Sequence, residues 1–327
     1  MKVFAYSCRD FDEKDFFVQA TQELGLELGY TDQIPTIDNC DLAAGSDFIS
    51  VMTTPITAEM MDRYKELGIR MISTRCMGFD HIDIAHAKEI GMIVNHINYD
   101  HEGIAEFTVM DILMAVRRIK EINARTMAGD FRLNDMMARQ LKDLTVGIVG
   151  AGKIGLSVLR DLQPFGCKLY YSNRSRNETA EKYAERLELD DLLAKCDVVS
   201  IHIEYNPETY HLFSKETIAK MKEGSILVNT SRGGIVDTEA LISALQSGHL
   251  GGAALDVIED EFDLFYYDCR DMDLTGRYID ILRNMPNVIY SHHMAFYYRA
   301  AIWGMVYNSV KSMKLYSEGK EVPMRLA

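Results

Sequence analysis

Several features that mark common protein classes are missing from this sequence of 327 residues. The cysteines form no Cys-x-x-Cys pair, which argues against a structural zinc site and a disulfide scaffold. No run approaches the roughly 18 apolar residues of a membrane span. The apolar start of MKVFAYSCRDFDEKDFF is too short for a signal-peptide core. We therefore expect a cytoplasmic protein with reduced thiols. The six cysteines are Cys8, Cys40, Cys76, Cys167, Cys196 and Cys269.

The chain also lacks an excess of basic residues. Lysine and arginine together number 35 against 49 aspartates and glutamates, which gives a formal net charge of −14. This balance argues against nucleic-acid binding and against an anionic membrane surface, and leaves a small molecule as the expected partner. Apolar residues make up 47% and charged residues 26%, as in folded globular proteins. At about 150 residues per domain, the length predicts two domains.

Two long stretches alternate short β-branched or aromatic runs with amphipathic helical patterns, which predicts βαβ units and parallel sheets. The first has strand patterns at 2–6, 47–52, 70–74 and 92–94, helical patterns at 57–67 and 82–90, and one long helical pattern at 102–128. The second has six strand patterns, at 145–149, 168–171, 198–202, 226–229, 253–257 and 288–290. A mixed charge run at 178–188 is interpreted as a solvated helix face. The last helix, at 300–316, is expected to pack on the first domain.

These patterns predict an α/β protein with two doubly wound parallel-sheet domains and a cleft between them. A flavodoxin-like domain is expected at residues 1–100 plus 297–327, and a Rossmann domain is expected at 101–296. Two chain crossings between the domains would suit hinge closure on a substrate.

The strongest local motif is a G-x-G-x-x-G sequence formed by Gly150, Gly152 and Gly155, directly after the strand pattern at 145–149. The first glycine permits a tight turn, the second lets the backbone approach a pyrophosphate, and the third lets helix and strand pack closely. The helix N-terminus then faces the anion. This motif predicts dinucleotide binding.

About twenty residues further on, the NAD fingerprint expects a carboxylate for the ribose 2′-hydroxyl. Asn173 stands there, followed by Arg174 and Arg176. Without the carboxylate a 2′-phosphate is not repelled, and the two arginines can pair with it. The alternative is that both arginines belong to a solvated turn. NADP use is therefore predicted alongside NAD.

Polar residues follow all six strands of the second stretch, at the sheet edge where ligands bind in parallel sheets. In order they are Gly150, Asn173, His202, Thr230-Ser231-Arg232, Asp256 with Glu259 and Glu261, and His292-His293. A guanidinium can hold a substrate carboxylate and polarise a carbonyl. An imidazole can exchange a proton with an alcohol oxygen, and a carboxylate behind it fixes its tautomer. Arg232, Glu261 and His293 together predict hydride transfer at a 2-oxo or 2-hydroxy acid.

The whole chain resembles the D-isomer-specific 2-hydroxyacid dehydrogenase family. The motifs that carry the resemblance run from Thr74 to Asp83, around Gly150, from Met221 to Gly233, and from Gly251 to Val257. Within the family the chain is most similar to D-lactate dehydrogenases, including the vancomycin-resistance type, through Asp130-Phe-Arg-Leu, Phe265-Tyr-Tyr-Asp-Cys and Met285-Pro-Asn-Val.

The resemblance implies roles for residues throughout the chain. Arg232, Glu261 and His293 match the catalytic set, with Glu259 as the rival of Glu261 and His292 as a bystander. The backbone of Met77 and Gly78 is expected to bind the substrate carboxylate, and Tyr99 and Phe296 to line its side-chain pocket. The remaining cofactor positions are Lys153, Ile154, His202, Ile203, Thr209, Thr230, Ser231 and Asp256. Glu204, Asn98-Tyr-Asp-His and Asn173 depart from the family pattern, and only the last puts cofactor choice in doubt.

The leading hypothesis is an enzyme that reduces pyruvate to D-lactate, with His293 as general acid. Tyr99 and Phe296 also suit branched or aromatic 2-oxo acids, so formation of 2-hydroxyisocaproate or phenyllactate is the alternative. An NADH-sensing corepressor-like protein and formate oxidation are more distant readings. The resemblance implies a homodimer through the cofactor domain, with 127–139 as an arm. The spacing of His81, His86, His96 and His101 matches no metal site, and none is expected.

Overall fold

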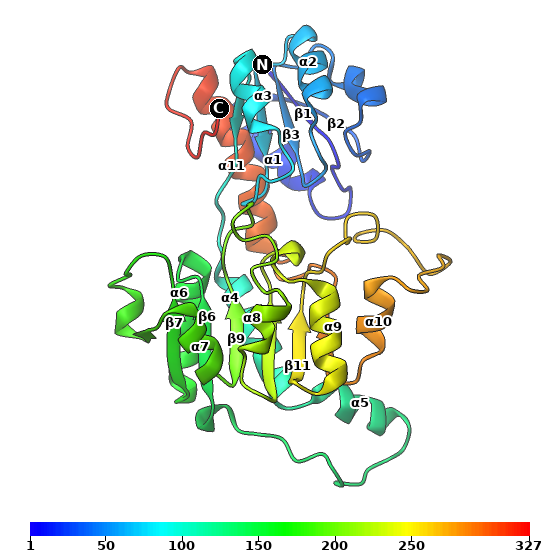
Figure 1. The fold of residues 1–327 in the computed structure, drawn as a ribbon. Helices are drawn as coiled ribbons and strands as arrows, with labels where there is room; N and C mark the ends of the chain where they lie inside the picture. Colours follow the sequence, from blue (N-terminus) through cyan, green and yellow to red (C-terminus); the bar gives the residue numbers. More distant parts are fainter. The chain divides into compact units, whose positions relative to one another are not determined.

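The computed structural model describes residues 1–327, which form two compact units (Figure 1). One unit comprises Met1–Asp100 together with Tyr297–Ala327, and the other comprises His101–Phe296. Each unit is built on one sheet in which every strand pairing is parallel. The predicted fold class of two parallel-sheet α/β domains is thus confirmed.

The discontinuous unit has a five-stranded sheet with the order β2-β1-β3-β4-β5. This is the order of the flavodoxin-like doubly wound fold. Four of the five strands agree with the predicted ones to within one or two residues, and β2 was not predicted. The strands are β1 (Lys2–Ala5), β2 (Glu27–Tyr30), β3 (Phe48–Val51), β4 (Met71–Thr74) and β5 (Ile93–Asn95).

Helices cover both faces of this sheet. On one face α1 (Lys14–Leu24) and α11 (Arg299–Ser317) pack against alternate residues of β1, with Phe17 and Val306 fully buried beside Ala5. On the other face lie η1 (Ile37–Ala43), α2 (Ala58–Glu66) and α3 (Ile84–Ile90), packed on the intervening residue Phe4. The prediction that the last helix belongs to the first domain is confirmed.

The continuous unit has a seven-stranded sheet with the order β12-β11-β10-β9-β6-β7-β8. The strand order reverses between β6 and β9, and this is where parallel sheets bind dinucleotides. The strands are β6 (Thr145–Val149), β7 (Lys168–Ser172), β8 (Glu185–Arg186), β9 (Val198–Ile201), β10 (Ser225–Asn229), β11 (Leu250–Leu255) and β12 (Val288–Tyr290).

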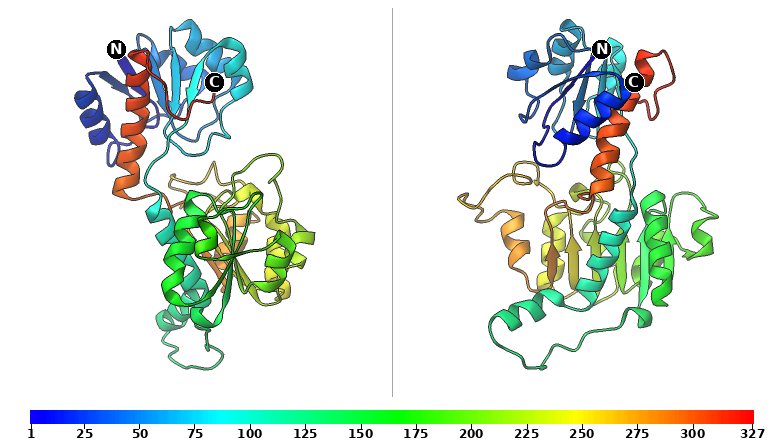
Figure 2. Two further views of the ribbon diagram at one scale, coloured as in Figure 1. Left: turned by 90° about the vertical axis from the view of Figure 1, so that its left-hand side faces the viewer. Right: turned by 180° about the vertical axis from the view of Figure 1, so that it is seen from behind.

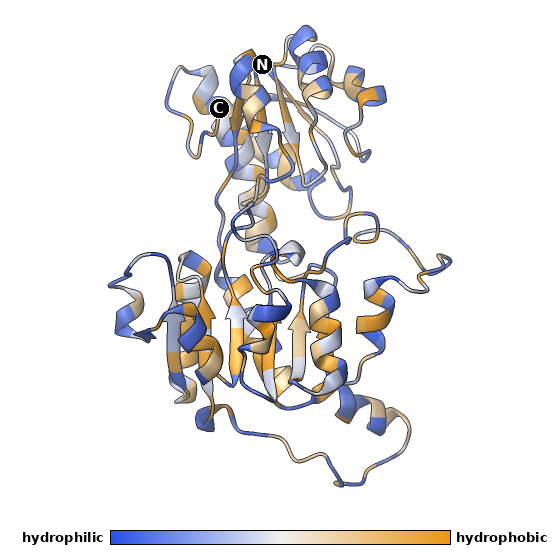
Figure 3. Cartoon of the chain, in the orientation of Figure 1, coloured by the Kyte–Doolittle hydropathy of each residue, from blue (hydrophilic) through white to orange (hydrophobic).

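Helices cover both faces of this sheet (Figure 2), and a separate hydrophobic cluster fills each face. One contains α4 (Glu102–Val116) and α6 (Lys153–Leu162), and the other contains α7 (Leu189–Lys195), α8 (Lys215–Ala219), α9 (Thr238–Ser247) and α10 (Tyr278–Asn284). Both faces of the sheet are therefore buried, so its strands are hydrophobic along most of their length (Figure 3). The 3₁₀ segments of this unit are η2 (Leu141–Asp143), η3 (Gln163–Phe165), η4 (Ala180–Lys182) and η5 (Gly233–Ile235).

Three expectations about this unit were wrong. The long helix at 102–128 is two helices, because α4 ends before Arg118, whose left-handed backbone (φ 54°) starts α5 (Ile119–Met127) in a new direction. The charge run at 178–188 is not a helix face but contains η4 and the short edge strand β8. That strand raises the number of strands in the sheet from the predicted six to seven.

After α5 the chain runs without helix or strand to η2. Phe131, Leu133 and Met137 of this stretch, and Met127 at the end of α5, are each at least 78% exposed. None of the helices combines the length and apolar character that a bilayer crossing requires.

Candidate active site

The predicted dinucleotide loop joins β6 to α6 at the reversal of the strand order. Gly150 has φ +97°, and a Cβ atom there would overlap the carbonyl group of His202 at the end of β9. A Cβ atom at Gly155 would overlap the Gly150 carbonyl oxygen. Gly152, which starts α6, has no atom within 4 Å of its Cβ position. The loop therefore leaves open space in front of a helix N-terminus, as a pyrophosphate requires, and Lys153 and Ile154 form the first turn behind it.

The residues after β7 are largely engaged with one another. Asn173 donates through Nδ2 to the Ser175 carbonyl at 3.0 Å. Arg176 forms a bidentate pair with Glu181 at 2.8 Å, which lowers the pKa of that carboxyl group. Arg174 is 89% exposed, with Glu208 at 3.7 Å. A 2′-phosphate would meet the exposed Arg174 directly, whereas Arg176 would first have to leave Glu181.

His202 follows β9 and its imidazole is neutral. Burial lowers its pKa to about 3, and its Nε2 lies 2.8 Å from Oγ of Ser200. The next residue, Ile203, accepts a hydrogen bond from Ser231 Oγ at 2.6 Å, which ties the end of β9 to the end of β10. His202 is therefore suited to a packing or hydrogen-bonding contact, not to proton transfer at neutral pH.

Two threonines of the predicted cofactor set are also held by hydrogen bonds. Thr230 Oγ1 lies 2.9 Å from Oγ1 of Thr108 on α4. Thr209 donates to the Glu204 carbonyl at 2.7 Å and shapes the turn after β9. Thr230 directly follows β10, where the pattern of polar residues after the strands predicts it, and Thr209 lies in the turn after β9.

The turn after β10 carries Arg232. The Asn229 side chain closes this turn, because its Nδ2 donates to the Arg232 carbonyl at 2.9 Å and its Oδ1 accepts the Ser231 amide at 3.0 Å. The half-buried Arg232 donates through Nη1 to the Ser231 carbonyl. Gly233 then passes directly against the backbone of Ile258. Asn229 is a positioning residue that the sequence pattern alone did not single out.

Glu261 and His293 form an ion pair. Nδ1 of His293 lies 2.8 Å from Oε1 of Glu261, whose side chain is almost fully buried. The second oxygen, Oε2, accepts the Ile258 amide at 2.9 Å and fixes the carboxylate. Glu261 thereby favours the tautomer with the proton on Nδ1 and holds the imidazole ring in its orientation.

Glu259, the rival carboxylate, has other partners. Its Oε1 lies 2.7 Å from Nε2 of His211, and its Oε2 accepts the Thr238 amide at the start of α9. His292 is exposed, and its ring meets the Phe265 ring edge-on. The structure thus brings Glu261 and His293 together and leaves Glu259 and His292 out of the pair.

Asp256 organises the chain around His293. Its carboxylate accepts hydrogen bonds from Ser291 Oγ, the Met294 amide and the Ala295 amide, at 2.6, 2.7 and 2.9 Å. Its carbonyl accepts the His293 amide at 2.7 Å. Both carboxylate oxygens are therefore engaged within the protein. Asp256 is a positioning residue for His293, and its contact with a cofactor stays a prediction.

The predicted carboxylate-binding residues Met77 and Gly78 lie in the discontinuous unit, in the loop after β4. That loop starts at Arg75, a fully buried arginine that sequence reasoning overlooked. Arg75 pairs with the buried Glu13 at 2.9 Å and donates to the Tyr6 carbonyl at 2.8 Å. Arg75 is the only charged residue between Met71 and Met77, and this isolated charge is the sequence signal that could have indicated its role.

The two residues predicted to contact the substrate side chain belong to different units. Tyr99 packs against α11, where a Cβ atom at Gly304 would stand 2.9 Å from the Tyr99 Cβ. Phe296 is buried in the continuous unit, and its ring meets the His293 ring edge-on at 5.9 Å.

A buried carboxyl group beside this site was also missed. Asp111 on α4 is 1% exposed, and neither of its side-chain oxygens has a hydrogen-bond partner. Burial, reinforced by the charge of Asp256, raises the pKa of Asp111 to about 8. Asp111 is therefore neutral at pH 7. Position 111 continues an apolar helix pattern, and no motif in the sequence marks it as a buried carboxyl group.

No group of three or more histidine, cysteine or acidic side chains is arranged to hold a metal ion. All six cysteines are free thiols.

Comparison with known proteins agrees with this arrangement. Residues 109–295 match the family model described as D-isomer specific 2-hydroxyacid dehydrogenase, NAD binding domain. A D-specific alpha-keto acid dehydrogenase of Enterococcus faecium is 37% identical over 311 residues, covering 95% of each chain. A D-lactate dehydrogenase of Lactiplantibacillus plantarum is 33% identical, covering 97% of each chain.

Solved structures superpose over nearly the whole chain. A D-2-hydroxyisocaproate dehydrogenase matches with a TM-score of 0.89 and 29% identity, covering 99% of each chain. A D-isomer specific 2-hydroxyacid dehydrogenase of Lactobacillus delbrueckii ssp. bulgaricus, in its NAD complexed form, matches with a TM-score of 0.85 and 27% identity over the same share. On the family match and these relatives, the chain belongs to the D-isomer specific 2-hydroxyacid dehydrogenases and carries their NAD-binding domain.

Proposed function

We propose that this protein reduces a small 2-oxo acid, with pyruvate as the preferred substrate, to the corresponding D-2-hydroxy acid. The observation that carries the proposal is the ion pair between His293 and Glu261, 2.8 Å apart. It stands at the same sheet edge as Arg232 and the Gly150 loop. A proton donor, a carboxylate-binding cation and a dinucleotide loop at one edge are the parts that a 2-oxo acid reductase needs.

In the proposed reaction each side chain has one task. The guanidinium of Arg232 binds the substrate carboxylate and polarises the adjacent carbonyl group. Imidazolium Nε2 of His293 gives its proton to the carbonyl oxygen as that oxygen gains negative charge. Glu261 holds Nδ1 and stabilises the positive charge until the proton leaves. A bound nicotinamide supplies the hydride that adds to the carbonyl carbon.

Both NADH and NADPH are proposed as cofactors. Gly150, Gly152 and Gly155 make room for a pyrophosphate at the start of α6. Position 173 carries an amide instead of a carboxylate, so no charge repels a 2′-phosphate, and the exposed Arg174 is available to meet one. Lys153, Ile154, His202, Ile203, Thr209, Thr230, Ser231 and Asp256 complete the proposed cofactor set.

The substrate contacts complete the proposal. The backbone of Met77 and Gly78 binds the substrate carboxylate together with Arg232, and Tyr99 and Phe296 contact the substrate side chain. The aromatic ring of Phe296 next to His293 also favours a second candidate, a reductase for branched or aromatic 2-oxo acids. A D-2-hydroxyisocaproate dehydrogenase among the matched structures supports this alternative. One methylene in an apolar pocket changes selectivity by only about 1–3 kcal/mol, so the choice needs a measurement.

The test is a matrix of initial rates. NADH and NADPH are each combined with pyruvate, 2-oxoisocaproate and phenylpyruvate, and His293→Gln serves as the control for chemistry. Fastest turnover of pyruvate supports the first candidate, and fastest turnover of either larger acid supports the second. Tight NADH binding without turnover of any of these acids overturns both and favours an NADH-sensing protein. The product is identified with D- and L-specific lactate assays.

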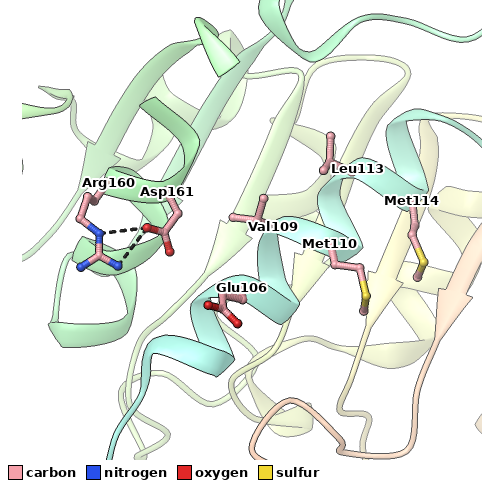
Figure 4. Close-up of a pocket in the computed structure, with 7 residues that line it drawn as sticks. All are labelled: Glu106, Val109, Met110, Leu113, Met114, Arg160 and Asp161. Carbon is pink, nitrogen blue, oxygen red and sulfur yellow. Dashed lines mark hydrogen bonds and ion pairs between the residues drawn. The ribbon is translucent and has the colours of Figure 1, made fainter. Parts of the chain in front are cut away.

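A homodimer through the continuous unit is also proposed, in the cytoplasm, where the free thiols stay reduced. A groove of about 430 Å³ lies between α4 and α6 (Figure 4). Apolar residues of α4 line its floor, and Arg160 and Asp161 of α6 line one side. The exposed apolar residues of the stretch after α5 offer a second contact surface. The apolar lining residues are Val109, Met110, Leu113 and Met114.

Light scattering after size exclusion tests the assembly. Met110→Glu combined with Leu133→Asp is expected to yield monomers because both changes place charge on apolar contact surfaces. Phe11→Glu changes an apolar side chain in the other unit that is 78% exposed and is expected to leave the assembly intact. A wild-type protein that runs as a monomer overturns the proposed dimer.

A further inference from the structure

Two residues with an unusual backbone are hydrogen-bonded to each other. Tyr266 has φ +71° and His293 has φ +59°, in the left-handed region that side chains with a Cβ atom rarely adopt. The Tyr266 hydroxyl donates to the His293 carbonyl oxygen at 3.1 Å. Such backbone conformations persist where surrounding contacts hold them, and they gather at functional sites. The tyrosine is therefore a candidate for more than packing.

The hydroxyl completes the support around His293. The His293 amide donates to the Asp256 carbonyl, and the two following amides donate to the Asp256 carboxylate. Glu261 holds the imidazole through Nδ1. The carbonyl oxygen of His293 has a partner in another part of the chain. It accepts the hydrogen bond from Tyr266, which lies in the loop between Glu261 and α10. The direction of the imidazole thus depends on a side chain outside the Asp256 network.

The ring of Tyr266 has a second contact. It meets the Phe296 ring edge-on, with centroids 6.3 Å apart and planes at 80°. Phe296 in turn meets the His293 ring at 5.9 Å and 88°. Tyr266 also lines a groove of about 460 Å³ together with Phe265, Tyr267 and His292. The Tyr266 ring therefore contacts Phe296 and borders this groove. The size of the Tyr266 ring limits how far the Phe296 side chain can move.

We propose that Tyr266 is a positioning residue for His293 and a specificity-determining residue for the side chain of the 2-oxo acid. This rests on the proposed function, in which His293 donates the proton and Phe296 contacts the substrate. The two roles belong to different atoms. The hydroxyl sets the direction of the imidazole for every substrate, and the ring sets the space available behind Phe296.

Two variants separate the roles. Tyr266→Phe removes the hydroxyl and keeps the ring, and is expected to lower kcat about five- to tenfold for all substrates, in line with the loss of one hydrogen bond. KM stays nearly unchanged, and the pH profile of kcat shifts because the imidazole sits differently against Glu261. Tyr266→Leu removes the ring, and is expected to raise the kcat/KM ratio of phenylpyruvate to pyruvate by at least about tenfold.

Tyr267→Phe is the matched control, because Tyr267 is the adjacent tyrosine and is 57% exposed. It is expected to match the wild type in all these readouts. Equal kcat and pH profiles in Tyr266→Phe and wild type overturn the positioning role. An unchanged substrate ranking in well-folded Tyr266→Leu overturns the specificity role, and circular dichroism checks the folding.

A measurement without turnover keeps this proposal separate from the proposed function. The ¹⁵N side-chain resonances of His293, assigned with His293→Gln, are expected to move in Tyr266→Phe and to stay in place in Tyr267→Phe. An enzyme that reduces none of the 2-oxo acids refutes the proposed function and the specificity role with it. Unmoved His293 resonances in Tyr266→Phe refute the positioning role whatever the activity.

Discussion

Gly233 lies so close to Ile258 that a Cβ atom added to the glycine would overlap the Ile258 carbonyl group. The contact joins two functional turns, because Gly233 follows Arg232 and the Ile258 amide binds the carboxylate of Glu261. The spacing between the Arg232 turn and the Glu261–His293 pair therefore depends on the absence of a side chain at Gly233.

Gly233→Ala is expected to separate these turns. We expect kcat/KM with pyruvate to fall at least about 100-fold, since a misplacement of about 1 Å costs that much. Cofactor binding, measured by NADH fluorescence, is expected to change far less because the Gly150 loop is untouched. Gly234→Ala is the matched control, since its Cβ atom would meet only the movable Tyr205 ring, at 2.9 Å. Equal losses in both variants would refute the role of the Gly233 contact.

Glu261→Gln is expected to lower kcat about 100-fold, the usual scale of a general acid–base contribution. The amide still reaches Nδ1 but carries no charge, so the imidazolium loses its counter-ion. Glu259→Gln, two residues away, is expected to keep kcat within a few fold, because Glu259 bonds to His211 and Thr238. The reverse ranking would make Glu259 the functional carboxylate.

Cofactor preference is expected to follow the residues after β7. Asn173→Asp places a negative charge near the ribose, and we expect kcat/KM with NADPH to fall about tenfold or more while NADH is unaffected. Glu181→Gln releases Arg176, and its gain with NADPH is expected to stay below about fivefold because exposed ion pairs are worth at most about 1 kcal/mol. Steady-state kinetics of both variants with NADH and with NADPH test these two predictions. An unchanged NADPH-to-NADH ratio in Asn173→Asp would show that the 2′-phosphate lies elsewhere.

Asp111 is expected to make the stability of the protein depend on pH. Its carboxyl group ionises near pH 3.9 in the unfolded chain but only near pH 8 in the native state. Between these values the native state binds one more proton, so the free energy of unfolding falls as pH rises. The Asp111→Asn variant has no carboxyl group to bind this extra proton, so its free energy of unfolding does not fall for this reason. The stability of Asp111→Asn relative to wild type should therefore rise by about 1.4 kcal/mol per pH unit within this window.

Urea unfolding of both proteins at pH 5, 6 and 7 measures this difference. The comparison isolates Asp111, since all other titrating groups are shared. Parallel pH dependences in the two proteins would mean that Asp111 is ionised in the native state, with a partner that the structure does not show.

The buried strands and the order of the site were predictable from sequence. Strand β6 lies inside the sheet and is buried along most of its length, so its apolar run is continuous and it was predicted with its observed bounds. The apolar edge strand β12 was also predicted with its observed bounds. The short polar edge strands β2 and β8 were missed, because residues such as Gly29 and Glu185 at a sheet edge resemble those of loops. The polar residues that follow the strands were predicted to lie together because the carboxyl ends of parallel strands lie at one edge of the sheet.

Residues that act through others were not predictable. Asn229 closes the Arg232 turn, and Arg75 anchors the loop of Met77 through a buried pair with Glu13. Neither residue belongs to a sequence motif. The partner of Arg75 is distant in the sequence, and Asn229 bonds to backbone atoms. The break at Arg118 was missed for a similar reason, since a single left-handed residue leaves the apolar pattern on either side intact.

The discontinuous unit has a consequence for the order in which the protein takes shape during synthesis. Its first 100 residues emerge before α11, whose Val306, Val310 and Met313 cover one face of their sheet, and before Ser309, which meets Ser50 in the core at 2.9 Å. The continuous unit has all its strands in one stretch and can finish first. The nascent chain thus holds a half-covered apolar sheet until α11 has been synthesised. Holdase chaperones would recognise that exposed face. The time for which the face stays exposed is set by the rate of translation and not by the folding rate of the unit.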